Sequence, residues 1–220
     1  MRRIMTLVAA VAATSFAACG GLPMMGGGGG AGGYKPAECQ NNQFGGDLSS
    51  AKEGQFATYV ADASGTKMTQ TVKVVGKSGA DWLVEHWTEA GPTSYGFLFQ
   101  IGGDRKIRKA WAAAKGDKEW TSIAVKEPAA AAGDAPKARI KESSEKKDVK
   151  AGSFDCKRVD ATVNVQGKDY ESSTWFSKDA PKLYIATEHG GAVAMEASGS
   201  KTWLEAKGDD AKPTLELPKS

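Results

Sequence analysis

Two histidines and two serine–lysine pairs are the residues of this chain whose types and spacing could support catalysis. His86 and His189 each follow a glutamate, but a metal site needs three or four convergent ligands, and the sequence has no His-Glu-x-x-His or Cys-x-x-Cys pattern. Ser64 and Ser198 each begin a Ser-x-x-Lys motif, as in penicillin-binding enzymes, but both lie in glycine turns and the partner Lys-Thr-Gly and Ser-Asp-Asn motifs are absent. We therefore expect no enzymatic activity, no metal and no cofactor.

Six tryptophans are the other chemical signal in the sequence. In a small β domain, tryptophans either pack in the core or line an apolar concave face that holds a lipid-like ligand, and both arrangements use the same residues. If the second arrangement holds, the candidate ligand face consists of Trp82, Phe99, Trp111, Val163 and Trp175.

The N-terminus carries an export signal. Arg2 and Arg3 form a positive n-region, an apolar run follows from residue 4 to 13, and small residues precede Cys19. This order resembles a bacterial lipoprotein signal, in which Cys19 becomes the lipidated first residue and anchors the chain to a membrane. An ordinary secretory signal cut at Ala18 and a cytosolic protein with an apolar start are the alternatives. Gly20 is not Asp, which favours the outer membrane by the enterobacterial sorting rule.

Removal of residues 1–18 changes the charge of the protein. The whole chain has 29 basic and 26 acidic residues, and the signal contains two of the basic ones, so the mature chain has a net charge of +1. A nearly neutral chain has no electrostatic footprint for nucleic acid, and we expect no such partner.

Two cysteines remain in an exported chain, Cys39 and Cys156. An even set in an oxidising compartment invites a disulfide between them. The alternative is two separate thiols, with Cys156 buried as a small apolar residue.

The rest of the mature chain divides into a tether, a β domain and a tail. Glycines run without a break from Gly26 to Gly30, so residues 19–53 are predicted to be a flexible Gly-rich tether. The folded domain should span residues 54–207, and residues 208–220 should form a frayed C-terminal tail rich in Asp, Lys and Pro.

A long hairpin organises the predicted domain. Val159, Ala161, Val163 and Val165 alternate with polar residues, and residues 166–169 turn the chain into a return strand that ends at residue 177. Other segments with strand-like patterns, each closed by Gly or Pro, indicate an antiparallel meander: residues 55–61, 68–75, 80–88, 93–101, 120–124, 182–188, 192–197 and 203–206. Residues 138–149 are charge-rich and should form a solvated edge.

Residues 105–115 fit two periods. Ile107, Trp111 and Ala114 are spaced for a helix, whereas Ile107, Trp111 and Ala113 share one face of a strand. The meander on either side favours the strand. The predicted fold class is therefore mainly β, a bent antiparallel sheet (half-barrel or open barrel) after a disordered tether.

Several short segments resemble a broad group of exported bacterial β-proteins and lipoproteins. They are residues 53–59, 109–111, 149–156, 175–177 and 180–181. That group is similar to the periplasmic half-barrels of the lipoprotein carrier and receptor type, the LolA/LolB-like fold. The resemblance covers about residues 53–207 and implies a bent sheet with an apolar concave face, and no catalytic residues come with it.

Two hypotheses about function follow. The first is an envelope lipoprotein that binds or carries an apolar, lipid-like ligand. The second is a structural or interaction lipoprotein whose sheet is filled by its own side chains. An apolar groove left open in the folded domain would favour the first, and a filled one the second.

Overall fold

The computed structural model describes residues 36–39, 42–127, 138–165 and 167–218. The predicted signal peptide, Cys19 and the glycine run lie outside the described residues. The described residues form strands and turns, and among them no helix is long and apolar enough to cross a membrane.

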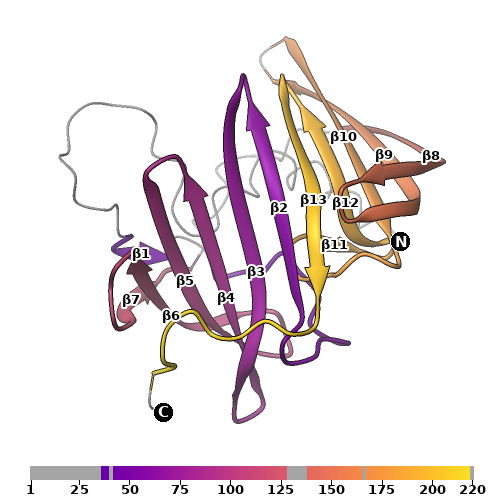
Figure 1. Cartoon of the computed structure of the whole chain (residues 1–220). Coiled ribbons are helices and arrows are strands. Elements are labelled where there is room, and N and C mark those ends of the chain that lie inside the picture. Colours follow the sequence, from indigo (N-terminus) through magenta and orange to yellow (C-terminus); the bar gives the residue numbers. More distant parts are fainter. Residues whose placement is uncertain (1–35, 40–41, 128–137, 166, 219–220) are drawn as a thin grey trace.

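One sheet contains every strand (Figure 1). The strands are β1 (Glu38–Cys39), β2 (Phe56–Ala63), β3 (Thr66–Ser78), β4 (Asp81–Ala90), β5 (Thr93–Ile101), β6 (Ile107–Ala114), β7 (Thr121–Val125), β8 (Ala138–Val149), β9 (Gly152–Val165), β10 (Lys168–Ser177), β11 (Ala186–Thr187), β12 (Gly190–Ala197) and β13 (Ser200–Gly208). Their order is β1-β7-β6-β5-β4-β3-β2-β13-β12-β10-β9-β8, with β11 beside β12. All pairs are antiparallel except β1 with β7.

The sheet is bent and is not closed into a barrel, as the sequence predicted. At the β8 end the sheet curls over, so that the turn between β8 and β9 reaches β13, although three strands separate β8 from β13 in the sheet order. There the Ala151 backbone N–H donates to the Leu204 carbonyl at 3.3 Å, and Lys147 pairs with Glu196 of β12 at 3.3 Å. The sheet therefore rolls over itself on this side.

The central hairpin is confirmed. β9 and β10 pair from Val165 with Lys168 down to Lys157 with Phe176, so the chain reverses between Val165 and Lys168. Val159 and Ala161 are buried, Val163 is half-buried and Val165 is exposed. The apolar side chains of β9 therefore become more exposed towards the turn that leads to β10. Residues 107–114 form strand β6, which confirms the strand interpretation of the ambiguous segment.

The sheet has two apolar faces, because its side chains alternate between them. We call the inner face the one that carries Val72, His86, Phe97 and Ala112, which lie opposite one another on β3 to β6. Its buried residues belong to the larger core cluster. The outer face carries a smaller cluster, of Val75, Leu83, Leu98, Ala113 and Trp120.

The prediction of a tether as far as residue 53 is wrong in its second half. Strand β1 pairs with β7, and Cys39 and Leu48 are buried in the inner cluster. Asn42 accepts a hydrogen bond from the Ile107 backbone N–H at 2.8 Å through its carbonyl. These apolar side chains stand far apart among polar ones without the period of a strand, so the sequence pattern did not reveal that they pack.

The prediction of a frayed tail is also corrected. Residues 209–218 cross the outer face, where Leu215 and Leu217 pack against the smaller cluster. The segment around residues 182–188 differs as well. Only Ala186–Thr187 is a strand, and Leu183, Tyr184 and Ile185 are buried side chains of a loop.

Candidate functional site

The predicted ligand face is divided between the two sides of the sheet. Trp82, Phe99 and Trp175 belong to the inner cluster, whereas Trp111 packs with the outer one. Phe99 lies directly opposite Ala110, so the next residue of β6 points to the other face. Val163 is half-buried in β9. The five residues therefore do not form one surface, and the predicted ligand face is corrected.

A loop side chain covers the inner face at β2 to β4. The ring of Tyr184, from the loop after β10, lies 4.8 Å from the ring of Tyr59, and its hydroxyl donates to Gln70 Oε1 at 2.7 Å. The Tyr59 hydroxyl in turn donates to the Ala192 carbonyl at 2.9 Å. Burial raises the pKa of both phenols far above the ordinary value, so they stay neutral donors. The inner face is thus filled here by the chain itself.

His86 lies beside this tyrosine. Its ring meets that of Tyr184 edge to face, with centroids 5.8 Å apart. Its Nε2 atom is buried and has no hydrogen-bond partner among the residues that the structure describes. Burial lowers the pKa of His86 to about 4, so the imidazole is neutral at pH 7. A neutral ring with one unpartnered nitrogen is the clearest unused polar group of the inner face.

Trp175 is held by charged neighbours. The Lys147 ammonium lies 3.7 Å from its ring centroid and the Arg158 guanidinium 5.1 Å. Its indole N–H donates to the Glu145 carboxylate. These side chains cover the face of the indole, so Trp175 packs between β8 and β10.

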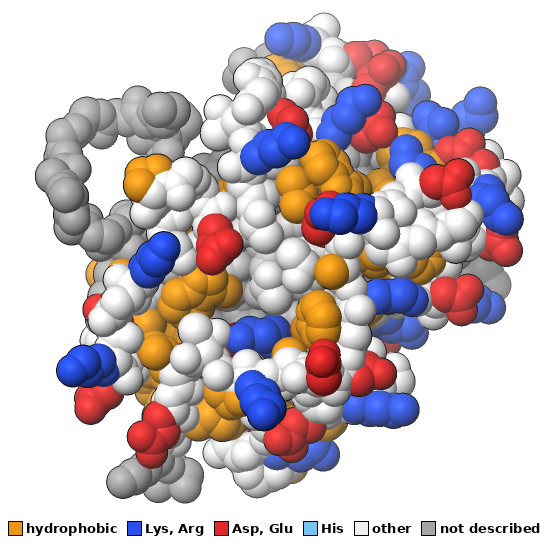
Figure 2. Space-filling view, viewed as in Figure 1, with side chains coloured by type: hydrophobic (Ala, Val, Ile, Leu, Met, Phe, Trp, Pro, Cys, Tyr) orange, Lys and Arg blue, Asp and Glu red, His pale blue; other side chains and the backbone are white. Residues whose placement is uncertain are grey.

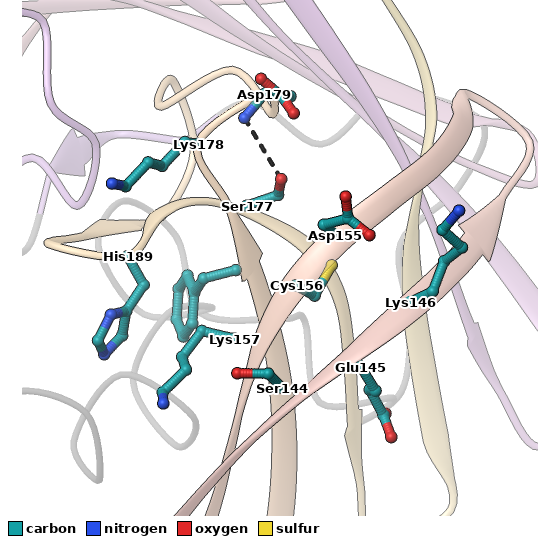
Figure 3. Close-up of a pocket in the computed structure, with 11 residues that line it drawn as sticks. Ser144, Glu145, Lys146, Asp155, Cys156, Lys157, Ser177, Lys178, Asp179 and His189 are labelled. Atoms are coloured by element: carbon teal, nitrogen blue, oxygen red, sulfur yellow. Dashed lines mark hydrogen bonds between the residues drawn. The ribbon is translucent and has the colours of Figure 1, made fainter.

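An open hollow of about 710 Å³ lies on the β8 side of the sheet (Figure 3). It is lined by polar and charged residues around Cys156 and Phe176: Ser144, Glu145, Lys146, Asp155, Lys157, Ser177, Lys178, Asp179 and His189. The Asp179 backbone N–H donates to Ser177 Oγ at 3.3 Å. Cations and carboxylates alternate around this hollow, so neither sign of charge predominates.

Cys156 is a free, buried thiol. The predicted disulfide between Cys39 and Cys156 is therefore not formed. Cys39 lies in β1, the first strand of the sheet order, whereas Cys156 lies in β9, the strand next to the last. The separation of the two strands is a property of the sheet topology, which cysteine spacing could not reveal.

We predict that Cys156 reacts slowly with thiol reagents in the folded protein. Burial is the main cause that raises the pKa of its thiol to about 11, and its Sγ donates to the Phe154 carbonyl at 3.6 Å. Because the thiolate is the reactive form, labelling by iodoacetamide at pH 8 should be about a hundredfold slower than that of a free cysteine. Unfolding in urea should restore the ordinary rate. Equal rates in folded and unfolded protein would contradict the buried position.

The two Ser-x-x-Lys motifs lie in tight turns. Ser64 joins β2 to β3 and Ser198 joins β12 to β13, and their backbone φ angles are 53° and 44°. Both side chains are exposed at hairpin tips, as the turn pattern predicted. Within the described part of the chain, no three His, Cys, Asp or Glu residues gather in a way that could hold a metal ion.

Two polar residues of consequence were missed in the sequence. Glu85 is fully buried on the outer face, and Tyr184 covers the inner one. Two consecutive polar residues, Glu85 and His86, in the middle of an apolar strand were the available signal for the first. No pattern marked Tyr184, because it lies in a loop.

Comparisons with known proteins give little. No protein family matches the sequence, and no curated protein matches it significantly. Among solved structures, it is similar to an exported protein with YmcC-like fold from Bacteroides fragilis NCTC 9343, with 12% identity and a TM-score of 0.36 over 76% of this chain and 99% of that one. It is also similar to PNGF-II, with 12% identity and a TM-score of 0.34 over 70% of this chain and 27% of that one. At these values the two likenesses support no inference about function.

Proposed function

We propose that this chain is an exported, lipid-anchored envelope protein whose β domain is a non-enzymatic structural or interaction module. The observation that carries the proposal is that the chain covers the apolar faces of its own sheet. Tyr184 and its neighbours pack on the inner face, and residues 209–218 cross the outer face. A sheet filled in this way needs no ligand to remove its apolar surface from water.

The anchor rests on the sequence. The n-region, apolar run and small residues before Cys19 occur in the order that a lipoprotein signal requires. We place the protein in the bacterial envelope, at the outer membrane on its periplasmic side, because residue 20 is glycine.

Replacement of Cys19 by Ser tests the anchor. The wild-type chain should incorporate labelled palmitate and fractionate with membranes, and the Cys19→Ser chain should incorporate none and remain unprocessed or soluble. Intact-mass spectrometry of the mature wild type should show the mass of a diacylglycerol and an acyl chain on a chain that begins at residue 19. A cleaved Cys19→Ser chain that stays on the membrane would contradict the lipoprotein assignment.

A second candidate function is binding of an apolar ligand on the inner face. Two observations favour it: Trp82 and His86 are only half-buried, and the Nε2 atom of His86 has no partner. A ligand with an apolar body and one hydrogen-bonding group would complete that site.

Purification without detergent separates the two candidates. The filled sheet predicts a protein that carries no lipid in native mass spectrometry and leaves its tryptophan emission unchanged when a fluorescent fatty acid is added. Bound lipid, or quenching that saturates at micromolar probe, would favour the second candidate. A small soluble protein without an apolar groove, measured in the same way, shows how much of the fluorescent fatty acid binds nonspecifically.

A further inference from the structure

The cations and carboxylates that alternate along the lining of the hollow beside β8 reach towards two different sides of it. The side chains of Lys157, Lys178 and His189 lie on one side, which we call the basic side (Figure 3). The carboxylates of Asp155 and Asp179 lie on the other, the acidic side. On the molecular face seen in Figure 2, Lys and Arg side chains are instead interspersed with Asp and Glu. Interspersed charges largely cancel one another, whereas separated charges give a local field with a direction.

Strand geometry sets the distance between the two sides. Asp155 and Lys157 are two residues apart on β9, so they share a face and their Cα atoms are about 7 Å apart. Ser144 of β8 and Phe176 of β10 lie opposite Lys157 on its two flanks. A hydroxyl, an ammonium group and an aromatic ring therefore form one row across the three strands.

The end of β10 and the turn before β12 complete the basic side. Ser177 ends β10, and its Oγ and carbonyl oxygen accept hydrogen bonds from the backbone N–H groups of Asp179 and Ala180, each at 3.3 Å. A Cβ at Gly190 would lie 2.0 Å from the Ser177 carbonyl oxygen. Glycine is therefore required there for the turn to pack against the end of β10, and this packing brings His189 to the hollow.

Glu142 holds the basic side together without neutralising it. Its Oε2 lies 3.5 Å from Lys157 Nζ, and its Oε1 lies 3.7 Å from His189 Nε2. Both distances exceed those of strong hydrogen bonds, and the three side chains are 26% to 45% exposed, so these ion pairs are weak. Lys178 has no ion-pair partner among the residues that the structure describes. The basic side therefore keeps donors available for an anion.

The acidic side keeps its two carboxylates available for a cation. Within the described ranges, neither Asp155 nor Asp179 forms an ion pair through its side chain. Lys146 lies opposite Asp155 across β8 and β9, but its ammonium lies beyond Asp155, away from the basic side (Figure 3). Phe176 adds a buried apolar ring to the lining.

We propose that the hollow binds a zwitterion that carries a phosphate and an ammonium group a few bonds apart, which is the chemistry of phosphoethanolamine. A phosphate has more acceptor oxygens than a carboxylate, and the basic side offers it two ammonium groups, an imidazole and the Ser144 hydroxyl. The ammonium group of the ligand lies against Asp155 and Asp179, and its methylene groups lie against Phe176. This group occurs both free and as a lipid headgroup. The site belongs to the folded domain and does not rest on the lipid anchor.

Calorimetric titration of the full-length Cys19→Ser chain tests the chemistry of the ligand. O-Phosphoethanolamine should bind with a dissociation constant below about 1 mM, and binding should weaken as the salt concentration rises. Ethanolamine and inorganic phosphate each carry one of its two charged groups and should bind at least about tenfold more weakly, as should β-alanine, whose anion is a carboxylate. Absence of binding at about 10 mM would overturn the site. Equal binding of any of the three simpler molecules would overturn the assignment of the ligand.

Lys178→Gln and Asp179→Asn test the two sides of the hollow separately. Each change should weaken the binding of O-phosphoethanolamine about tenfold. Both side chains are exposed, so the circular dichroism spectrum and the unfolding transition should not change. Lys118→Gln and Glu119→Gln, exposed in the turn before β7, are the matched controls and should leave the affinity unchanged. Unchanged affinity in Lys178→Gln or Asp179→Asn would overturn the location of the site.

Vesicles distinguish the two sources of the ligand. If the source is a headgroup, the Cys19→Ser chain should co-sediment with phosphatidylcholine vesicles only when they also contain phosphatidylethanolamine, because choline has no N–H to donate to the carboxylates. Binding of O-phosphoethanolamine without co-sedimentation would assign the site to the free molecule. Equal co-sedimentation with both kinds of vesicle would contradict recognition of the ammonium group.

Discussion

Replacing Tyr184 by Ala should lower the free energy of unfolding by about 3–5 kcal/mol, because it removes a buried ring and leaves a cavity on the inner face. The ring packs against the ring of Tyr59, with centroids 4.8 Å apart and the planes tilted by 35°, and its hydroxyl donates to Gln70 Oε1 at 2.7 Å. Tyr184→Phe keeps the ring and removes the hydroxyl, so it should cost about 1–3 kcal/mol by leaving Gln70 Oε1 without its donor. Urea titration of the three proteins measures both effects.

Tyr170 supplies the matched control for this change. It is 44% exposed at the turn end of β10, and Tyr170→Ala should alter stability by less than about 0.5 kcal/mol. If Tyr184→Ala were no more harmful than Tyr170→Ala, the loop that carries Tyr184 would not be packed on the sheet. The proposal of a self-filled inner face would then lose its support.

Acidification from pH 6.5 to pH 4 should lower the free energy of unfolding by about 3 kcal/mol through His86 alone. The folded protein holds this histidine neutral, with its pKa lowered to about 4 by burial, whereas in the unfolded chain it titrates near 6.5. Between these two pKa values the unfolded chain binds a proton at His86 and the folded protein does not. The contribution of His86 to the free energy of unfolding is therefore complete above pH 6.5 and is lost as the pH falls towards 4. Below pH 4 both states are protonated and the loss ends.

His86→Leu should remove this part of the pH dependence. Because Nε2 has no hydrogen-bond partner, an apolar side chain of similar size should change stability at pH 7.5 by less than about 1.5 kcal/mol. His189→Gln is the control. His189 is partly exposed and its Nε2 lies 3.7 Å from Glu142, so the slope between pH 6.5 and 4 should persist in that variant. A His86→Leu protein with an unchanged slope would show that another group governs acid sensitivity.

The sheet was predictable from the sequence because its signals are local. Alternation along residues 159–165 and glycine at each turn gave the central hairpin and the meander, and the neighbouring strands decided in favour of β6. A bent, open sheet follows from many antiparallel strands without a closing pair.

What could not be predicted depends on contacts between distant segments. Leu215 and Leu217 pack against the outer cluster, whose strands are far away in the sequence, and Cys39 and Cys156 lie in strands near opposite ends of the sheet order. Tyr184 covers the inner face from an irregular loop. Spacing along the chain does not encode such meetings, so the tether boundary and the tail were predicted incorrectly. For the same reason the sequence could not decide between a disulfide and a buried Cys156 thiol, or between a ligand face and tryptophans that only pack.

The pairing of β2 with β13 determines when the molecule can be completed. The strands from β2 to β7 and from β8 to β12 are joined mainly by hairpins between near neighbours, but β2 meets β13 from Ala63 with Ser200 to Phe56 with Gly208. A chain that is synthesised from its N-terminus must therefore leave the edge of β2 open until almost all of it has been made. Unpaired edges of this kind recruit other strands, and pairings this distant form slowly. The interval before β13 arrives is thus the period in which new chains are most exposed to aggregation and to proteolysis.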